Sequence, residues 1–220
     1  MIKVAPSLLA ADYMNFDTEI DKVIAAGADV LHYDVMDGEF VPAITFGQGI
    51  AKQASRKPIP LDAHLMIVHP EKHIEEFAEA GASYITVHQE AAGFALKDTL
   101  KAIRAAGCKA GVSVKPFTSV SAIEEVLELC DLILIMTVEP GKGGQKLIPF
   151  TIDKVREVYN MCKRAGVSPV IEVDGGINAE TAHLVTEAGA DMLVAGSAFF
   201  KAEDKAGFVK LLKSMPGYRD

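Results

Sequence analysis

The sequence predicts an α/β protein whose strands and helices alternate to form a closed (β/α)₈ TIM barrel. Three observations lead to this class: eight short β-rich runs, amphipathic segments between them, and a recurring helix–glycine–strand junction. The junction repeats as AAGADVLHYD, EAGASYITVH and EAGADMLVAG. Strict alternation requires parallel strands joined by right-handed crossovers. Eight such units in 220 residues fit a closed barrel better than a flavodoxin-like sheet of about five strands.

The expected strands are short apolar runs that end in polar or small residues. They cover residues 3–7, 30–36, 60–66, 84–88, 109–114, 131–136, 170–174 and 191–196. The expected helices repeat apolar residues at three- and four-residue steps, and many of them close on glycine. They include residues 17–27, 70–81, 96–107, 121–130 and 150–166.

The chain shows no linker, low-complexity segment or charge block that would divide it. We therefore expect one domain over residues 1–220. The longest gap between expected strands, 137–169, holds VEPGKGGQKLIPF before its helix. A long connection of this kind predicts a functional loop.

Composition limits the classes of partner. The formal net charge is −8 and half of the residues are hydrophobic, so nucleic acid and anionic membranes are not expected partners. A nest of backbone N–H groups can still bind a small anion. Cys108, Cys130 and Cys162 are widely spaced and fit buried thiols in a reducing cytosol. We see no signal peptide, and the run LILIM is too short to span a bilayer, so we expect a cytoplasmic protein.

Two expected strands carry a histidine and an aspartate in matching positions near their carboxyl ends. In a barrel of this class the active site forms at those ends. His32, Asp34 and Met36 share one face of the second strand, and Asp62, His64 and Met66 share one face of the third. Because burying such groups unpaired is costly, we expect them to hold a divalent metal ion. Two nitrogens and two oxygens suit Zn²⁺, Fe²⁺, Mn²⁺ or Co²⁺.

Each of these residues also has a structural interpretation. A single histidine at a strand end is usually hydrogen-bonded within the fold, and a single aspartate there usually caps the next helix. The matching pairs, with a further acid beside a Gly-Gly step at 174–176, favour the metal site. His69, His73 and His183 are expected to be solvated, and His88 at the end of the fourth strand is left outside the metal set.

Glycine follows each of the last three strands. PGKGGQ (140–145), DGG (174–176) and AGS (195–197) let backbone N–H groups approach an anion, and a phosphate site is the hypothesis that they favour. The alternative is that the glycines only shape turns. Met36, Met66 and Met136 also stand at strand ends. Methionine is usually a core filler, but here the three predict an apolar lining beside the reacting carbons.

The motifs together resemble the ribulose-phosphate 3-epimerase family. The resemblance is carried by APSLLAADY, LHYDVMDGEFVPAITFG, LDAHLMI, VKPFTSV, MTVEPGKGGQKLI, IEVDGGI and AGSAFF, nearly end to end. It implies a barrel of the ribulose-phosphate-binding type that interconverts D-ribulose 5-phosphate and D-xylulose 5-phosphate in the pentose phosphate pathway. It further implies one divalent metal ion (Zn, Fe, Mn or Co) held by His32, Asp34, His64 and Asp174. Asp34 and Asp174 are also the implied acid–base pair.

The predicted substrate-binding residues combine the resemblance with the strand-end pattern. They are Ser7, His64, Met36, Met66, Met136, Gly141, Lys142, Gly143, Gly144, Gly175, Gly176, Gly196 and Ser197. Three positions depart from the family pattern: Glu39 replaces a histidine, Ala43 an asparagine, and Lys142 a phenylalanine of the lid. Because these positions lie in loops near the barrel mouth, D-allulose 6-phosphate is kept as an alternative substrate.

The predicted chemistry is inversion of the carbon next to a ketone. Asp34 removes the C3 proton from one face and Asp174 supplies one to the other, through an enediolate that the metal stabilises. A metal-free sugar-phosphate decarboxylase on a related barrel is a competing class. Such enzymes carry D-x-K-x-x-D on the third strand, where this chain has His64 in place of the lysine. A catalytically dead binding protein is the third alternative. Apolar helix faces that could pack against another subunit predict a homo-oligomer.

Overall fold

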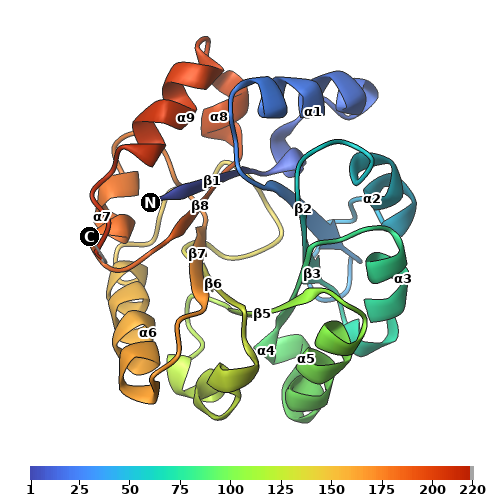
Figure 1. The fold of residues 1–220 in the computed structure, drawn as a ribbon, viewed down its shortest axis with the longest axis vertical. Helices are drawn as coiled ribbons and strands as arrows, with labels where there is room; N and C mark the ends of the chain where they lie inside the picture. The colour runs from blue at the N-terminus through green and yellow to red at the C-terminus, as the bar shows by residue number, and fades with distance from the viewer. Residues whose placement is uncertain (219–220) are drawn as a thin grey trace.

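The computed structural model describes residues 1–218, and eight parallel strands form its centre. The last two residues of the predicted 1–220 domain lie outside the described part. The strands are β1 (Lys3–Pro6), β2 (Leu31–Met36), β3 (Leu61–Met66), β4 (Tyr84–His88), β5 (Lys109–Val114), β6 (Leu132–Met136), β7 (Val170–Asp174) and β8 (Met192–Ala195). They are hydrogen-bonded in the order β1-β8-β7-β6-β5-β4-β3-β2. A parallel bridge between Ser7 and His32 joins β1 to β2 and closes the ring, which confirms the predicted barrel (Figure 1).

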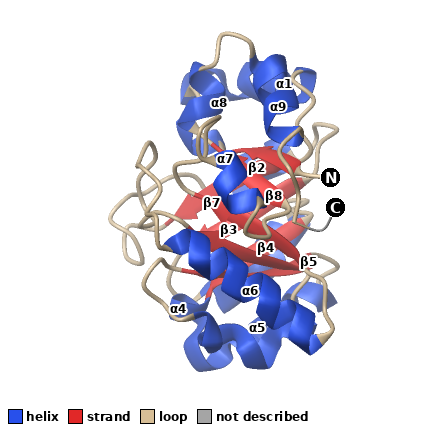
Figure 2. Cartoon of the chain, turned by 90° about the vertical axis from the view of Figure 1, so that its left-hand side faces the viewer, coloured by secondary structure: helices blue, strands red, loops and turns tan. Residues whose placement is uncertain are grey.

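Helices surround the strands, and the side view shows them packed above and below the barrel (Figure 2). The α-helices are α1 (Phe16–Ala25), α2 (Gln48–Ala54), α3 (Ile74–Glu79), α4 (Gln89–Ala92), α5 (Leu96–Ala105), α6 (Thr151–Ala165), α7 (Ala182–Thr186), α8 (Ser197–Lys201) and α9 (Lys205–Lys213). The 3₁₀-helices are η1 (Leu8–Ala10), η2 (Tyr13–Asn15), η3 (Pro70–Lys72), η4 (Gly93–Ala95) and η5 (Val120–Leu129).

Two expected helices differ from the structure. The segment 70–81 forms η3 and then α3 in place of one helix. The segment 121–130 lies largely in the 3₁₀-helix η5 and not in an α-helix. Its buried residues Val120, Ile123, Val126 and Leu127 fit three- and four-residue steps alike, so their spacing does not separate the two helix types.

Strand alternation divides the apolar core into two parts. Leu31, Tyr33 and Val35 of β2 point outward into the larger core between strands and helices. A smaller core fills the barrel and is formed by Ala5, Val30, Tyr84, Leu132, Leu134, Met136, Val138, Met192 and Val194. The barrel side of the strands also carries His32, Asp62, Thr86 and Glu172, all fully buried. Buried polar groups need partners, so their positions point to the functional site.

The three cysteines are buried thiols that form no disulfide bond, as the sequence predicted. Burial raises the pKa of the Cys130 thiol to about 12, which makes it inert at neutral pH. Within residues 1–218, every helix is too short or too polar to cross a membrane.

Candidate metal centre and active site

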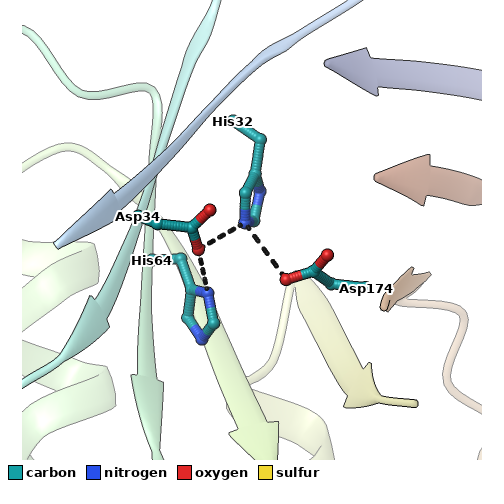
Figure 3. Close-up of side chains that lie close together, drawn as sticks. All are labelled: His32, Asp34, His64 and Asp174. Atoms are coloured by element: carbon teal, nitrogen blue, oxygen red, sulfur yellow. Dashed lines mark hydrogen bonds and ion pairs between the residues drawn. The ribbon is translucent and has the colours of Figure 1, made fainter. Parts of the chain in front are cut away.

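Four side chains from three strands converge at the carboxyl-terminal mouth of the barrel (Figure 3). His32 and Asp34 lie on β2. His64 lies on β3, where it pairs with Asp34 of β2, and Asp174 ends β7. His64 Nδ1 lies 2.9 Å from Asp34 Oδ1. His32 Nε2 lies 3.2 Å from that same oxygen and 4.0 Å from Asp174 Oδ2. The structure therefore brings together the four residues predicted to hold a metal.

These four residues fit a single divalent cation. Each offers one ligand atom, and the four atoms all lie within 4.8 Å of one another. His32 Nε2 is buried and makes no hydrogen bond to any described residue, although both carboxylates are near. A buried ring nitrogen without a partner is costly, and a cation would satisfy it. The two imidazoles and two carboxylates suit a borderline transition metal such as Zn²⁺ or Fe²⁺.

A second group of acids lies behind His32. Asp62 Oδ2 is 2.7 Å from His32 Nδ1, and Glu172 Oε1 is 3.5 Å from the same nitrogen. Asp62, which the sequence placed beside the metal set, therefore holds the far nitrogen of the ring and leaves Nε2 to face the mouth. A carboxylate on the far nitrogen commonly orients a metal-ligating histidine.

Glu172 was missed by the sequence analysis. Burial and the neighbouring negative charge of Asp62 raise the pKa of Glu172 to about 8. The sequence could have indicated Glu172, because it stands two residues before Asp174 and so lies on the same face of β7.

The two aspartates at the mouth have different electrostatic environments. Burial alone would raise the pKa of Asp34, but the adjacent rings of His32 and His64 hold it well below its usual range. Burial and the charge of Asp34 raise the pKa of Asp174 to about 6. Burial alone would lower the pKa of His32, but the carboxylates of Asp34, Asp62 and Glu172 raise it. A pair of carboxyl groups with separated pKa values is typical of an acid–base pair.

A cavity of about 650 Å³ opens beside these aspartates. Asp34 and Asp174 both reach its wall, and Ser7 Oγ donates a 2.6 Å hydrogen bond to Asp34 Oδ2 from the same wall. The lining includes most of the predicted substrate-binding residues: Ser7, Met36, Met66, Met136, Gly141, Lys142, Gly143, Gly144, Gly175, Gly176, Gly196 and Ser197. The cavity is therefore large enough for a sugar phosphate, with carboxylates on one part of its wall and glycine loops on another.

Two of these glycines are required by close backbone contacts. Gly176 has φ +68°, and a Cβ there would overlap the backbone nitrogen of Leu147. Gly175 has φ +126°, and a Cβ there would lie 2.8 Å from the backbone nitrogen of Val138. The turn after β7 thus packs directly on the long loop after β6, and both loops border the cavity. That loop lies where the sequence predicted a functional connection.

His64 differs from the other predicted substrate-binding residues because it does not line the cavity. Its ring is fully buried between Asp34 and His88 and is not part of the cavity wall. The substrate contact predicted for His64 stays a prediction, and the strand register places Asp34 beside it on β2. His69 is exposed, and His73 and His183 are half-buried, all three away from the metal group.

His88, which the sequence analysis left aside, belongs to this cluster. Its Nε2 lies 2.9 Å from His64 Nε2, and the two rings are stacked at 5.0 Å. The available signal was Glu90, an acid two residues after His88, which contacts His88 Nδ1 at 3.2 Å. Burial alone would lower the pKa of His88, and its position beside His64 lowers it further, to about 4.

The three departures from the family pattern fall in different places. Lys142 lines the cavity, whereas Glu39 and Ala43 do not. Glu39 lies in an exposed turn after β2, where the Asp37 carboxylate accepts its backbone N–H at 2.8 Å. Of the three, Lys142 is thus the one beside the cavity.

A closed barrel with two carboxylates, a His/Asp cluster that could hold a cation, and glycine loops around one cavity at its mouth has the arrangement of a TIM-barrel enzyme. The sequence model described as the Ribulose-phosphate 3 epimerase family matches residues 3–200. The chain belongs to that family, which confirms the resemblance.

Curated relatives agree with this assignment, and a solved structure agrees with the fold. The chain is 49% identical over 209 residues to "Ribulose-phosphate 3-epimerase" of Bacillus subtilis (strain 168), covering 93% of this chain and 95% of that protein. It is 46% identical to the protein of the same name from Aquifex aeolicus (strain VF5), covering 96% of each. A crystal structure of 3-hexulose-6-phosphate synthase from Salmonella typhimurium has a TM-score of 0.71 with 96% of each chain covered. At 21% identity, that likeness concerns the fold alone.

Proposed function

We propose that this chain is a metal-dependent epimerase that inverts C3 of D-ribulose 5-phosphate to give D-xylulose 5-phosphate. The observation that carries the proposal is that Asp34 and Asp174 reach the same cavity from β2 and β7, three strands apart around the ring. Carboxylates on separate strands can address opposite faces of one carbon. The family membership supports this substrate, because the curated relatives carry that name.

The glycine loops supply the other end of the substrate site. Gly175, Gly176 and Gly196 line the cavity together with the 141–144 segment. Backbone N–H groups at such turns bind phosphate, and the barrel class commonly uses its last loops for this purpose. With the phosphate held there, the sugar carbons would extend toward Asp34 and Asp174, beside Met36, Met66 and Met136.

The pKa difference supports separate roles for the two aspartates. Asp34 is held ionised by the neighbouring imidazoles and accepts the C3 proton. Asp174, whose pKa is raised to about 6, is the better proton carrier and delivers a proton to the opposite face. The roles exchange in the reverse reaction. Ser7 donates to the second oxygen of Asp34, which leaves Oδ1 as the oxygen directed toward the metal set.

His32, Asp34, His64 and Asp174 would hold the divalent cation. When bound there, such a cation acts as a Lewis acid that stabilises the negative charge developing on the sugar oxygens. The protein's own contribution is to fix four ligand atoms within 4.8 Å in a buried setting.

Proton NMR in D₂O tests the proposal. Purified protein is incubated with D-ribulose 5-phosphate and, in parallel, with D-allulose 6-phosphate, each with and without a chelator. We expect deuterium at C3 and conversion of the ribulose sugar, both lost on chelation and restored by metal. Faster exchange of the allulose sugar would shift the substrate assignment. If the metal-loaded protein neither exchanges the C3 proton nor converts either sugar, the epimerase proposal is overturned.

We also propose that residues 1–220 act as one domain and that the chain assembles as a homo-oligomer. Both stay predictions, and sedimentation velocity of the full chain measures the second.

A further inference from the structure

His64 is held from both sides by other side chains. Its Nδ1 lies 2.9 Å from Asp34 Oδ1 in the proposed cation site. Its Nε2, on the far edge of the ring, lies 2.9 Å from His88 Nε2. Both imidazoles are fully buried, and they stack with an interplanar angle of 29°. His64 therefore has one nitrogen toward the site and one toward the end of β4.

The contact continues from His88 to an acid. His88 Nδ1 lies 3.2 Å from Glu90 Oε2. The other oxygen of Glu90 accepts the backbone N–H of Lys115 at 2.7 Å and the hydroxyl of Thr118. A continuous chain of side chains thus runs from Asp34 through His64 and His88 to Glu90.

The hydrogen atoms that these contacts require fix the direction of each hydrogen bond from Glu90 to His64. A carboxylate only accepts, so the Glu90 contact requires a hydrogen on His88 Nδ1. In a neutral ring His88 Nε2 is then an acceptor, and His64 Nε2 must donate to it. With its hydrogen on Nε2, neutral His64 presents the lone pair of Nδ1 to the cation site. Nδ1 and Asp34 Oδ1, 2.9 Å apart, are then two acceptors, and a cation shared between them would satisfy both. The tautomer of His64 is therefore set by His88 and Glu90, two residues outside the four-residue cation set.

Two loops and helix α6 hold His88 and Glu90 in place. The Phe40 ring, from the turn after β2, lies 4.8 Å from the His88 ring, and Lys115 Nζ sits 3.9 Å above Phe40. Buried Lys154 of α6 donates to the carbonyl oxygens of Lys115, Pro116 and Thr118 at 2.7–2.9 Å. The segment that holds Glu90 is thus fixed by a cation with three acceptors, so Glu90 and His88 have little freedom to turn.

We propose that His88 and Glu90 are positioning residues that lock the tautomer and orientation of His64, so that its Nδ1 is ready to bind the divalent cation. This inference rests on the proposed function, because it concerns the same cation site. It adds two residues on β4 and α4 that neither line the cavity nor belong to the four-residue metal set. Partners at this distance typically change metal affinity 10–100-fold when they are removed.

The test uses Co²⁺ binding by the full chain after removal of bound metal. The dissociation constant is measured by competition with a chelating indicator, and the visible d–d spectrum reports the ligand set. We expect H88F, which keeps an aromatic ring but cannot accept a hydrogen bond, to weaken Co²⁺ binding roughly 10–100-fold and to alter the spectrum. We expect H88Q, which retains an acceptor at the end of its side chain, to recover much of the affinity. E90Q should be intermediate.

A matched control comes from a second histidine–glutamate pair. His69 Nδ1 lies 3.2 Å from Glu71 Oε1, at the same spacing and distance as His88 and Glu90, but on the exposed surface. E71Q should leave Co²⁺ affinity and spectrum unchanged. Near-UV circular dichroism of each metal-free variant checks the fold.

Several outcomes would overturn the inference. Wild-type affinity in H88F would do so, and so would equal losses in H88F and H88Q, which would indicate a packing role alone. If H88F fails to fold, E90Q decides: an affinity and spectrum equal to those of E71Q would reject the proposal. Wild-type protein that binds no Co²⁺ would instead remove the metal site of the proposed function, and this inference with it.

Discussion

Asp34 and Asp174 lie on either side of one imidazole: His32 Nε2 is 3.2 Å from Asp34 Oδ1 and 4.0 Å from Asp174 Oδ2. The ring is buried and its far nitrogen is held by Asp62 at 2.7 Å. The two carboxylates thus share one positively polarised neighbour, yet the pKa of Asp34 is lowered and that of Asp174 is raised to about 6. The difference follows from contacts, because Asp34 also contacts His64 and Ser7.

This relationship predicts that both aspartates are essential for epimerisation. D34N and D174N should each lower kcat at least about 100-fold, because positioned acid–base groups contribute about 10²–10⁴-fold. Each substitution preserves shape, so circular dichroism should be unchanged. The measurement is a coupled assay of xylulose 5-phosphate formation, with the metal content of each variant determined alongside.

The same variants test whether the reaction uses two bases or a single base. If each aspartate serves one face, a variant retaining Asp34 should still exchange the C3 proton of D-ribulose 5-phosphate in D₂O, though it forms little product. D153N, a change in an exposed carboxylate of α6, is the control and should behave as wild type. A near-normal turnover in D34N or D174N would reject the two-base scheme.

Metal binding should stabilise the fold. A ligand present at one hundred times its dissociation constant adds about 2.7 kcal/mol to the free energy of unfolding. For a chain of this size that corresponds to a Tm increase of roughly 5–10 °C. We expect this increase when Zn²⁺, Mn²⁺ or Co²⁺ is added to metal-free wild type, and little or none in D174N. Scanning calorimetry measures it, and an equal increase in both proteins would place the cation elsewhere.

The sequence predicted the barrel because periodicity and glycine junctions act locally, and each strand–helix unit repeats them. It also predicted His32, Asp34 and Met36 on one face, because strand alternation alone decides that. It could not place the His64 ring relative to the cavity, since whether a ring lies at the wall or behind a carboxylate depends on the register between β2 and β3. Glu172 and the His88–Glu90 pair were missed because their partners come from other strands or loops.

The turn after β7 predicts a strong difference between two glycine substitutions. G176A places a Cβ against the backbone nitrogen of Leu147 at a φ of +68°, so we expect a loss of at least about 1 kcal/mol in the free energy of unfolding. Because this turn borders the cavity, KM for the sugar phosphate should also rise several-fold. Urea unfolding and steady-state kinetics measure the two effects.

Gly49 supplies the control for that substitution. It lies in α2, and a Cβ there meets no described atom within 4 Å. G49A should be neutral or stabilising by roughly 0.5–1 kcal/mol, as for alanine in a helix, with KM unchanged. If G176A and G49A behave alike, the backbone contact between the two loops is not a constraint on the site.

The hydrogen bonds that hold the Glu90 carboxylate also predict how the free energy of unfolding depends on pH. Burial alone would raise the pKa of Glu90, but hydrogen bonds from His88, Thr118 and the Lys115 backbone lower it to about 2. A carboxyl group whose pKa is lower in the folded state adds stability above its ordinary value of 4.5, and that stability is lost as pH falls toward 2. The shift corresponds to about 3 kcal/mol at most. E90Q should therefore be less stable than wild type at pH 7 and approach it near pH 2, whereas E71Q should follow the wild-type curve throughout. Urea unfolding at several pH values between 7 and 2 measures these differences, and parallel curves for E90Q and wild type would contradict the anchored carboxylate.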